Sequence, residues 1–230
     1  MKRLFIKTLI ATVAVAAFGV ASAQDIKERT IKFGTVGAEA HPSVPGMKKF
    51  KELVEARSGG KIKVNLFFNG TLGSDQASVT AMQGGTLEMA SMNSGIFASQ
   101  VKDFAVFDFP FLFASEKESD ALVDGPVGRK LHAKLEEKGL VGLSYWELGY
   151  RHITNSKRPV NKVEDLEGLK LRVIPNPINV AWVKALGANP TPMPFPEVYG
   201  GMEQKAIDGQ ENPVAAVSYT HLTLPTKRIV

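Results

Sequence analysis

The amino-acid sequence predicts an α/β fold whose strands run mostly parallel. Short stretches of alternating apolar and polar residues, typical of strands, are separated by longer stretches with apolar residues at helical spacing. This alternation of strand and helix is the pattern of parallel sheets covered by helices. The composition agrees, since 44% of the 230 residues are hydrophobic and 22% are charged, as in ordinary globular proteins.

Between residues 30 and 92 we expect three strands and two helices. Val44, Met47 and Val54 lie at helical spacing, and the glycines that follow at 59 and 60 are typical of a helix end. The strands are expected at 30–36, 62–68 and 87–92, and the helices at 43–57 and 75–83.

The pattern is less regular in the middle of the chain. The phenylalanine-rich stretch 104–113 contains Pro110, and we expect it to be a buried connector rather than a regular element. A helix is expected at 126–138, because proline suits the first turn of a helix. The stripe expected to be buried on this helix consists of Val127, Leu131 and Leu135.

The second half is expected to repeat the α/β pattern. Strands are expected at 140–146, 151–154, 169–174 and 207–210, and helices at 177–186 and 196–205. A boundary between two lobes is expected near 148–152, where the chain runs from strand to strand without a long linker. Such a crossover is suited to a hinge.

The sequence lacks the residues that several classes of catalytic and metal sites require. The chain has no cysteine and four histidines, no two of them four positions apart, so a thiolate zinc site, a cysteine nucleophile and an HExxH metal helix are excluded. The GxSxG, GxxxxGK[ST] and GxGxxG motifs of hydrolase and nucleotide sites do not occur either. We therefore expect no enzyme activity, no cofactor and no metal.

The net charge of +5 does not indicate a nucleic-acid partner. The excess cations lie in residues 1–23 and 218–230, and residues 24–217 hold 23 basic and 23 acidic residues. The first 23 residues have three basic side chains, an apolar run at 9–20 and the sequence Ala-Ser-Ala at 21–23, the pattern of a secretory signal peptide. We expect cleavage after Ala23 and export to the periplasm.

Arg172 is the charged residue with the clearest candidate role. It lies near the end of an expected strand, on the face of Lys170, and Pro175 follows shortly after. Ligand clefts form at the carboxyl ends of strands in α/β sheets, and a guanidinium there binds a carboxylate through two parallel hydrogen bonds. The alternative is a surface arginine in a weak ion pair, and the pattern by itself leaves both open.

Two further candidates carry weaker signals. Arg151 begins the segment RHITN after an aromatic stretch, and Asn212 lies in the segment DGQENP. The alternatives are again a surface arginine and an asparagine that forms a turn before proline.

Six segments in order resemble one known family, the extracytoplasmic solute receptors of tripartite ATP-independent periplasmic (TRAP) transporters, of the dicarboxylate and sialic-acid receptor type. The resemblance covers about 24–217. The segments are IKFGTV at 31–36 with His41 and Pro42, DFPFLF at 108–113, RHITNSKRP at 151–159, LEGLKLRV at 166–173, LGANPTPMPF at 186–195 with EVY at 197–199, and AIDGQENP at 206–213.

The resemblance implies a two-lobed periplasmic solute-binding fold of the type II kind, which closes on an organic acid anion. It implies that Arg172 and Arg151 hold the ligand carboxylate, that Asn212 contacts it and that Phe195 lines the pocket. It also implies a membrane permease pair as partner. A monomer and no nucleic-acid partner are expected. Four further candidates for the pocket wall lie at expected strand ends: Glu39, Asn93, Trp146 and Asn176.

The expected domain organisation follows from the same resemblance. Residues 1–23 form the signal peptide, 24–148 the first lobe, and 149–217 part of the second lobe, so that the second lobe and the hinge are incomplete. Residues 218–230 resemble the translated read-through of a sequencing adapter, the alternative being a divergent C-terminus. An exported α/β enzyme and a periplasmic sensor for a signalling partner are the other functions considered, and the ligand is left open among C4-dicarboxylates, sugar acids and other organic acids.

Overall fold

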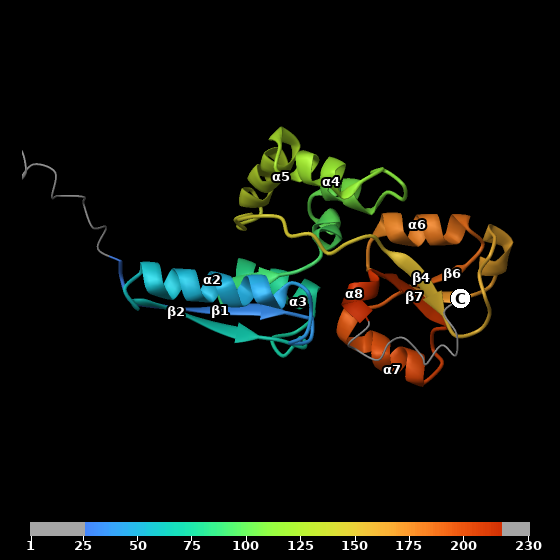
Figure 1. The fold of residues 1–230 in the computed structure, drawn as a ribbon, viewed down its shortest axis with the longest axis horizontal. Helices are drawn as coiled ribbons and strands as arrows, with labels where there is room; N and C mark the ends of the chain where they lie inside the picture. Colours follow the sequence, from blue (N-terminus) through green and yellow to red (C-terminus); the bar gives the residue numbers. More distant parts are fainter. Residues whose placement is uncertain (1–25, 218–230) are drawn as a thin grey trace, which may run out of the picture.

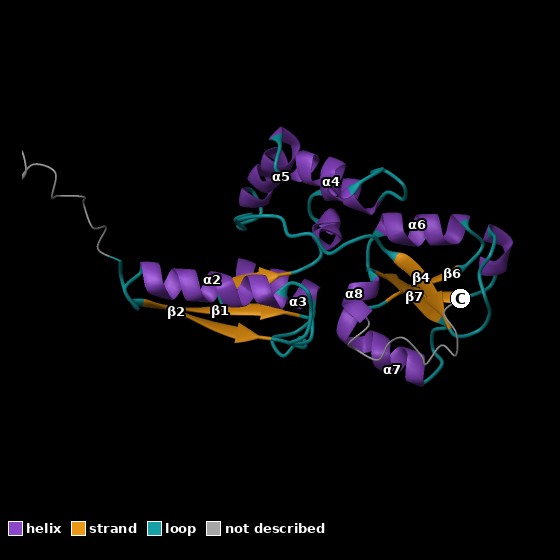
Figure 2. Cartoon of the chain, in the orientation of Figure 1, coloured by secondary structure: helices purple, strands orange, loops and turns teal. Residues whose placement is uncertain are grey.

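The computed structural model describes residues 26–217, so the predicted signal peptide and the segment 218–230 lie outside the described residues. Two sheets, each with its own helices, occupy opposite ends of the molecule in Figure 1, and a third group of helices lies between them. Figure 2 shows the same separation by secondary structure. Among residues 26–217, no helix has the length and apolar character needed to cross a membrane.

The first sheet is entirely parallel, as predicted. Its strands are β1 (Arg29–Thr35), β2 (Ile62–Phe67) and β3 (Met89–Ser91), in the order β2-β1-β3. The helices α2 (Val44–Arg57) and α3 (Asp75–Gln83) connect them. Phe33 of β1 and Val64 of β2 pack with Val44 and Met47 of α2, and these four buried side chains form the core of this layer. The strand and helix alternation of the sequence is therefore confirmed here.

The second sheet is mixed, with three parallel strands and one antiparallel strand. Its order is β4-β7-β5-β6, and β4 runs antiparallel to β7. The strands are β4 (His152–Asn155), β5 (Lys170–Val173), β6 (Asn189–Pro192) and β7 (Gly209–Asn212). The helices are α6 (Pro177–Ala185), α7 (Val198–Glu203) and α8 (Val214–Val217), with the short 3-10 helices η3 (Val163–Leu166) and η4 (Phe195–Glu197). Leu171 and Val173 of β5 pack with Val183 of α6 in the core.

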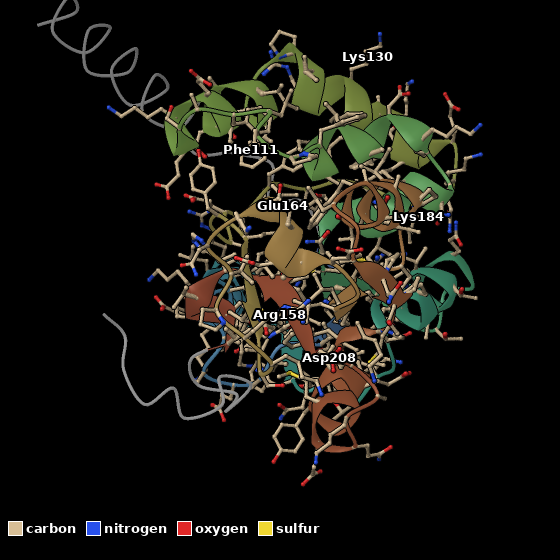
Figure 3. The ribbon with its side chains drawn as sticks, turned by 90° about the vertical axis from the view of Figure 1, so that its right-hand side faces the viewer. Phe111, Lys130, Arg158, Glu164, Lys184 and Asp208 are labelled. Atoms are coloured by element: carbon tan, nitrogen blue, oxygen red, sulfur yellow. The ribbon has the colours of Figure 1, made fainter. Side chains whose placement is uncertain are left out.

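The helices between the sheets are η1 (Ser94–Ser99), η2 (Lys102–Asp108), α4 (Glu116–Val123) and α5 (Pro126–Glu136). Phe104 of η2 and Leu131 and Leu135 of α5 share one buried cluster, which also contains Ile174 from the end of β5. Lys130 of α5 points away from this cluster in Figure 3 and is exposed.

Two predictions about this helical group are wrong. The stretch 104–113 is not a buried irregular connector, because η2 covers its first half and because Phe109 and Phe111 are 52% and 102% exposed. Phe111 has a left-handed φ of 59°, which turns the chain away from the core. Val127 is not buried on α5 but 46% exposed.

The reason for the exposure of Val127 is the close contact between α4 and α5. A Cβ atom on Gly128 would lie 1.8 Å from the carbonyl oxygen of Val123, so the helices meet at this glycine. The buried face of α5 therefore runs through Gly128, Leu131 and Leu135 and leaves Val127 outside.

The predicted strand at 140–146 is also wrong. The chain from 140 to 151 has no regular structure, and no strand within residues 26–217 pairs with it. Val141 and Leu143 are 72% and 64% exposed. This segment instead carries the chain from the helical group to β4 of the second sheet (Figure 1).

Neither α4 nor β6 was predicted from the sequence. β6 contains Pro190 and Pro192, which argue against a central strand. The strand is at the edge of its sheet, and the amide nitrogens of Asn189 and Met193 donate to Leu169 and Val173 at 2.8 and 3.1 Å. The prolines occupy the alternate positions, where no donor toward β5 is needed.

Candidate functional site

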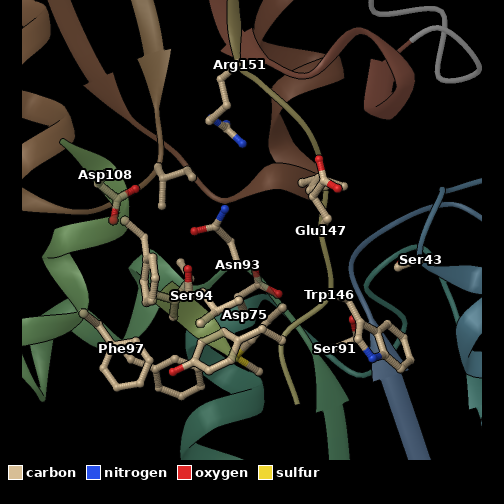
Figure 4. Close-up of a pocket in the computed structure, with 18 of the residues that line it drawn as sticks. Ser43, Asp75, Ser91, Asn93, Ser94, Phe97, Asp108, Trp146, Glu147 and Arg151 are labelled. Carbon is tan, nitrogen blue, oxygen red and sulfur yellow. The ribbon is translucent and has the colours of Figure 1, made fainter. Parts of the chain in front are cut away.

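A cavity of about 1180 Å³ is lined by residues of both sheets and of the helical group between them. The carboxyl ends of strands from both sheets lie at this cavity. Its wall contains Thr35 of β1, Ser91 of β3, Arg172 of β5 and Asn212 of β7. This is where parallel α/β sheets place their ligands. Figure 4 shows how side chains from the two halves of the chain point into this space.

Arg172 lies on β5, with β7 on one side and β6 on the other. It is 3% exposed and lines the cavity. Its Nε donates to the carbonyl oxygen of Met193 at 2.8 Å, which fixes the plane of the guanidinium. Its terminal nitrogens make no hydrogen bond to any residue within 26–217. A buried cation with two unpaired donors is suited to binding a carboxylate in bidentate fashion.

The environment of Arg172 lowers its affinity for protons without neutralising it. Burial lowers the pKa of Arg172 to about 10, an effect opposed by the negative charges of Glu211 and Asp75 and reinforced by the positive charge of Arg151. The side chain is therefore cationic at neutral pH.

Arg151 reaches the same cavity because β4 runs antiparallel to β7. His152 is paired with Asn212, so the residue just before β4 lies beside the carboxyl end of β7. The side chain of Arg151 points into the cavity in Figure 4. It is held there by Glu211, which accepts from Nε and, at 3.0 Å, from Nη2 of Arg151. The backbone oxygen of Glu211 accepts from the same Nη2 at 2.8 Å.

Asn212 and Phe195 also line the cavity. Asn212 is 6% exposed, and its Nδ2 donates to Oε1 of Gln210 at 2.7 Å, which fixes the orientation of the amide. The ring centroid of Phe195 lies 5.8 Å from Cζ of Arg172. At this distance the aromatic face stabilises the guanidinium.

The four further candidates divide into two pairs. Asn93 and Trp146 line the cavity, and both stand on its wall in Figure 4. Glu39 does not line it, because its exposed carboxylate forms an ion pair with Lys48 at 2.9 Å. Asn176 does not line it either, because its amide is used inside the protein, where Oδ1 caps α6 by accepting from Ile178 N at 2.8 Å.

Asp75 and Glu211 line the cavity but were not singled out from the sequence. Asp75 is the first residue of α3 and is half-buried. Burial raises its pKa to about 7, against the opposing effect of the positive charge of Arg172. The signal for Asp75 was its place directly after the N-cap Ser74, at the start of the helix that follows β2. The signal for Glu211 was its place beside Asn212 in the AIDGQENP segment.

Comparison with known proteins identifies relatives over nearly the whole described chain. The family model of bacterial extracellular solute-binding proteins, family 7 (DctP), matches residues 33–223. The 2,3-diketo-L-gulonate-binding periplasmic protein of Escherichia coli K12 is 40% identical over 203 residues, which are 88% of this chain and 62% of the relative. The chain spans about 50–62% of the length of the first three curated relatives that it matches.

Solved structures agree with this relationship. The sugar acid binding protein of Advenella mimigardefordensis, crystallised with galactonate, has a TM-score of 0.83 and 44% identity, over 86% of this chain and 64% of that one. A TRAP periplasmic solute-binding protein of Sulfurospirillum deleyianum with bound succinate has a TM-score of 0.81 and 33% identity, over 86% and 64% of the two chains. The predicted two-lobed fold of periplasmic solute-binding proteins is confirmed.

Proposed function

The chain belongs to the bacterial extracellular solute-binding proteins of family 7, and from this membership we propose that it is the receptor part of a TRAP transporter. In this proposal it is exported to the periplasm, its signal peptide is cleaved after Ala23, and it captures an organic acid anion. It acts by binding and not by catalysis. A membrane permease is its partner, and it works as a monomer without a cofactor or a metal.

The observation that carries the proposal is the state of Arg172. A guanidinium that is 3% exposed normally has its donors paired, because an unpaired buried polar group is costly. Here the terminal nitrogens face a cavity and have no partner among the described residues. A ligand carboxylate would supply two acceptors and the opposite charge.

Arg151 and Asn212 complete the proposed carboxylate site. Arg151 stands at the same end of the sheet, and because Glu211 holds its Nε and one terminal nitrogen, it contributes the remaining terminal nitrogen. The amide of Asn212 is oriented by Gln210 and offers a further polar contact. These roles are assigned by family resemblance and supported by their common position on the cavity wall.

We propose a sugar acid as the ligand class. The aromatic side chains Phe195, Trp146 and Tyr150 line the cavity and suit the apolar face of a sugar chain or ring. Asp75 and Asn93 line the same cavity and supply acceptors and donors for hydroxyl groups. The curated relative that binds 2,3-diketo-L-gulonate and the neighbour crystallised with galactonate support this class.

The division into lobes at 24–148 and 149–217 is part of the same proposal. The two sheets then belong to different lobes, joined by the irregular segment around residues 140–151. Closure of the lobes over the ligand would remove water from the arginine and carboxylate pair and strengthen it.

The test is isothermal titration calorimetry with galactonate on the wild-type chain and on Arg172→Ala. The matched control is Lys170→Ala, on the same strand and face, whose Nζ donates to the Lys205 carbonyl oxygen at 2.7 Å outside the cavity. We expect Arg172→Ala to weaken binding by at least about 100-fold and the control to leave it unchanged. Equal affinities in all three proteins would contradict the assignment of Arg172.

A further inference from the structure

One wall of the cavity contains a contact between the two halves of the chain that the binding residues above do not explain. Asp108 ends η2 in the helical group. Its carboxylate accepts a hydrogen bond from Nδ2 of Asn176 at 2.8 Å and another from Nδ2 of Asn179 at 3.0 Å. Both asparagines belong to the start of α6, beside the second sheet. The same nitrogen of Asn176 also donates to the backbone oxygen of Gly95 at 2.9 Å.

The contact is closely packed. Asn176 and Asn179 are each 3% exposed. A Cβ atom on Gly95 would lie 2.3 Å from Oδ2 of Asp108, so only glycine at 95 allows the carboxylate to reach the asparagines. Ile174 packs beside them in the cluster of Phe104. Polar and apolar contacts therefore join η1 and η2 to the start of α6.

The contact is also directly connected to Arg172. Asn176 caps α6 through Oδ1 and lies four residues after Arg172 on a short stretch that contains Pro175, whose φ is fixed by its ring. A displacement of Asn176 relative to η2 would therefore move Arg172 relative to the first sheet. Asp108 itself faces the cavity (Figure 4).

We propose that Asp108 is a positioning residue and that its carboxylate, through Asn176 and Asn179, is the pivot about which the second-sheet half moves toward the first-sheet half. The inference rests on the proposed function, because closure on a ligand is the motion that uses the pivot. Asp108 contacts no ligand in this proposal. It determines where Arg172 stands when the cavity closes.

The negative charge of Asp108 is better explained by its role in positioning the start of α6 than by a contribution to the stability of the fold. Burial raises the pKa of Asp108. The hydrogen bond from Asn179 and the positive charge of Arg151 oppose this effect, Glu211 adds to it, and the hydrogen bond from Asn176 opposes it again. An ionised carboxylate in this place lowers the free energy of unfolding. What it gains is two separate acceptor oxygens, Oδ2 for Asn176 and Oδ1 for Asn179, where an asparagine would offer one oxygen and an NH2 group that is itself a donor.

The test measures the distance between the two halves by pulsed electron paramagnetic resonance. The chain has no cysteine, so Lys49→Cys on α2 and Glu203→Cys on α7 give two unique labels at exposed positions. Asp108→Asn is compared with Asp103→Asn, a residue of the same η2 helix whose exposed carboxylate pairs with Lys134 within the helical group. Both are measured without ligand and with galactonate.

We expect Asp108→Asn to broaden the distance distribution without ligand and to weaken galactonate binding about tenfold, while the thermal unfolding midpoint stays the same or rises. Asp103→Asn should change none of the three. Asn179→Ala, which removes one donor, should give a smaller broadening and provides the test if Asp108→Asn does not fold.

A distance distribution that is unchanged in Asp108→Asn and in Asn179→Ala would overturn the proposal. So would a lower unfolding midpoint with unchanged distances and unchanged affinity, because that result describes a residue with a structural role only. If the distribution broadens while the wild-type chain binds no organic acid, the pivot stands and the proposed function fails.

Discussion

Glu211→Gln is a direct test of how the second arginine of the site is held. The carboxylate of Glu211 accepts from two nitrogens of Arg151, and the side chains are 4% and 26% exposed. Glutamine has nearly the same shape but offers one acceptor in place of two and carries no charge. The substitution therefore leaves a partly buried guanidinium with one hydrogen bond fewer and without its counter-charge.

The size of the effect follows from the burial of the pair. Hydrogen bonds to charged groups contribute about 1.5–3 kcal/mol, and breaking a fully buried pair costs about 3–5 kcal/mol. Because Arg151 is one quarter exposed and one hydrogen bond remains, we expect a loss of about 2 kcal/mol in the free energy of unfolding. For a chain of this size, this loss lowers the melting temperature by about 4–8 °C.

Differential scanning calorimetry and urea unfolding measure this loss. The matched control is Glu52→Gln, which removes an ion pair with Lys49 whose side chains are 64% and 60% exposed, and which should change stability by less than about 1 kcal/mol. If Glu211→Gln unfolds at the same temperature and urea concentration as this control, the pair does not hold Arg151 and the reasoning is wrong.

Three further predictions concern stability. Burial raises the pKa of Asp75 to about 7 from its ordinary value of 3.8, so its contribution to stability is full below about pH 4 and lost as the pH rises through 7. In urea unfolding at pH 8, Asp75→Asn should therefore be more stable than wild type by about 2 kcal/mol, a figure that is reduced because the side chain is partly exposed. At pH 4 the two proteins should be almost equally stable, and an equal difference at both pH values would contradict this. Gly209→Ala places a Cβ atom 2.1 Å from the carbonyl oxygen of Thr154 on the paired strand and should cost about 3 kcal/mol or more, whereas Gly200→Ala on α7 meets no atom within 4 Å and should stabilise by about 0.5–1 kcal/mol. Ser74→Ala removes the N-cap of α3, whose Oγ accepts from Ala77 N at 3.2 Å, and should lower the urea midpoint by the equivalent of about 1 kcal/mol; an unchanged midpoint would show that the cap contributes nothing.

Periodicity predicted the elements that are amphipathic and covered on one side. The alternation of Leu171 and Val173 with Lys170 and Arg172 matches β5, where the two apolar residues are buried against α6. The observed range of β5, Lys170–Val173, also differs little from the expected range 169–174. For β7 the expected range 207–210 is two residues early, because Ile207 gives an apolar signal but packs in the cluster of α7 rather than in the strand.

Elements that depend on their place in the sheet were not predictable from local pattern. Pro190 and Pro192 look incompatible with a strand until β6 is known to lie at an edge. The stretch 140–146 has the composition of a strand, but strand formation needs a neighbour to share its backbone hydrogen bonds, and none of the strands within 26–217 provides one.

The residues of the candidate site also differ in how far local sequence pattern could predict their place. The strand end placed Arg172 where a cleft was expected, but the pattern left a surface arginine open as the alternative, and its proposed binding role came from family resemblance. The place of Arg151 depended on the antiparallel direction of β4, which the sequence does not specify, and its role came from family resemblance. Glu39 and Asn176 were equally plausible by position, but Lys48 and the cap of α6 use their polar atoms. Side-chain partners of this kind become known only with the tertiary structure.

The proposed function requires that the cavity at Arg172 binds the carboxylate of an organic acid. We would titrate the wild-type chain by calorimetry with galactonate and with galactitol, which has the same carbon chain but a hydroxymethyl group in place of the carboxylate. We expect galactonate to bind and galactitol to bind at least about 100-fold more weakly. Equal affinity for the two compounds would contradict it.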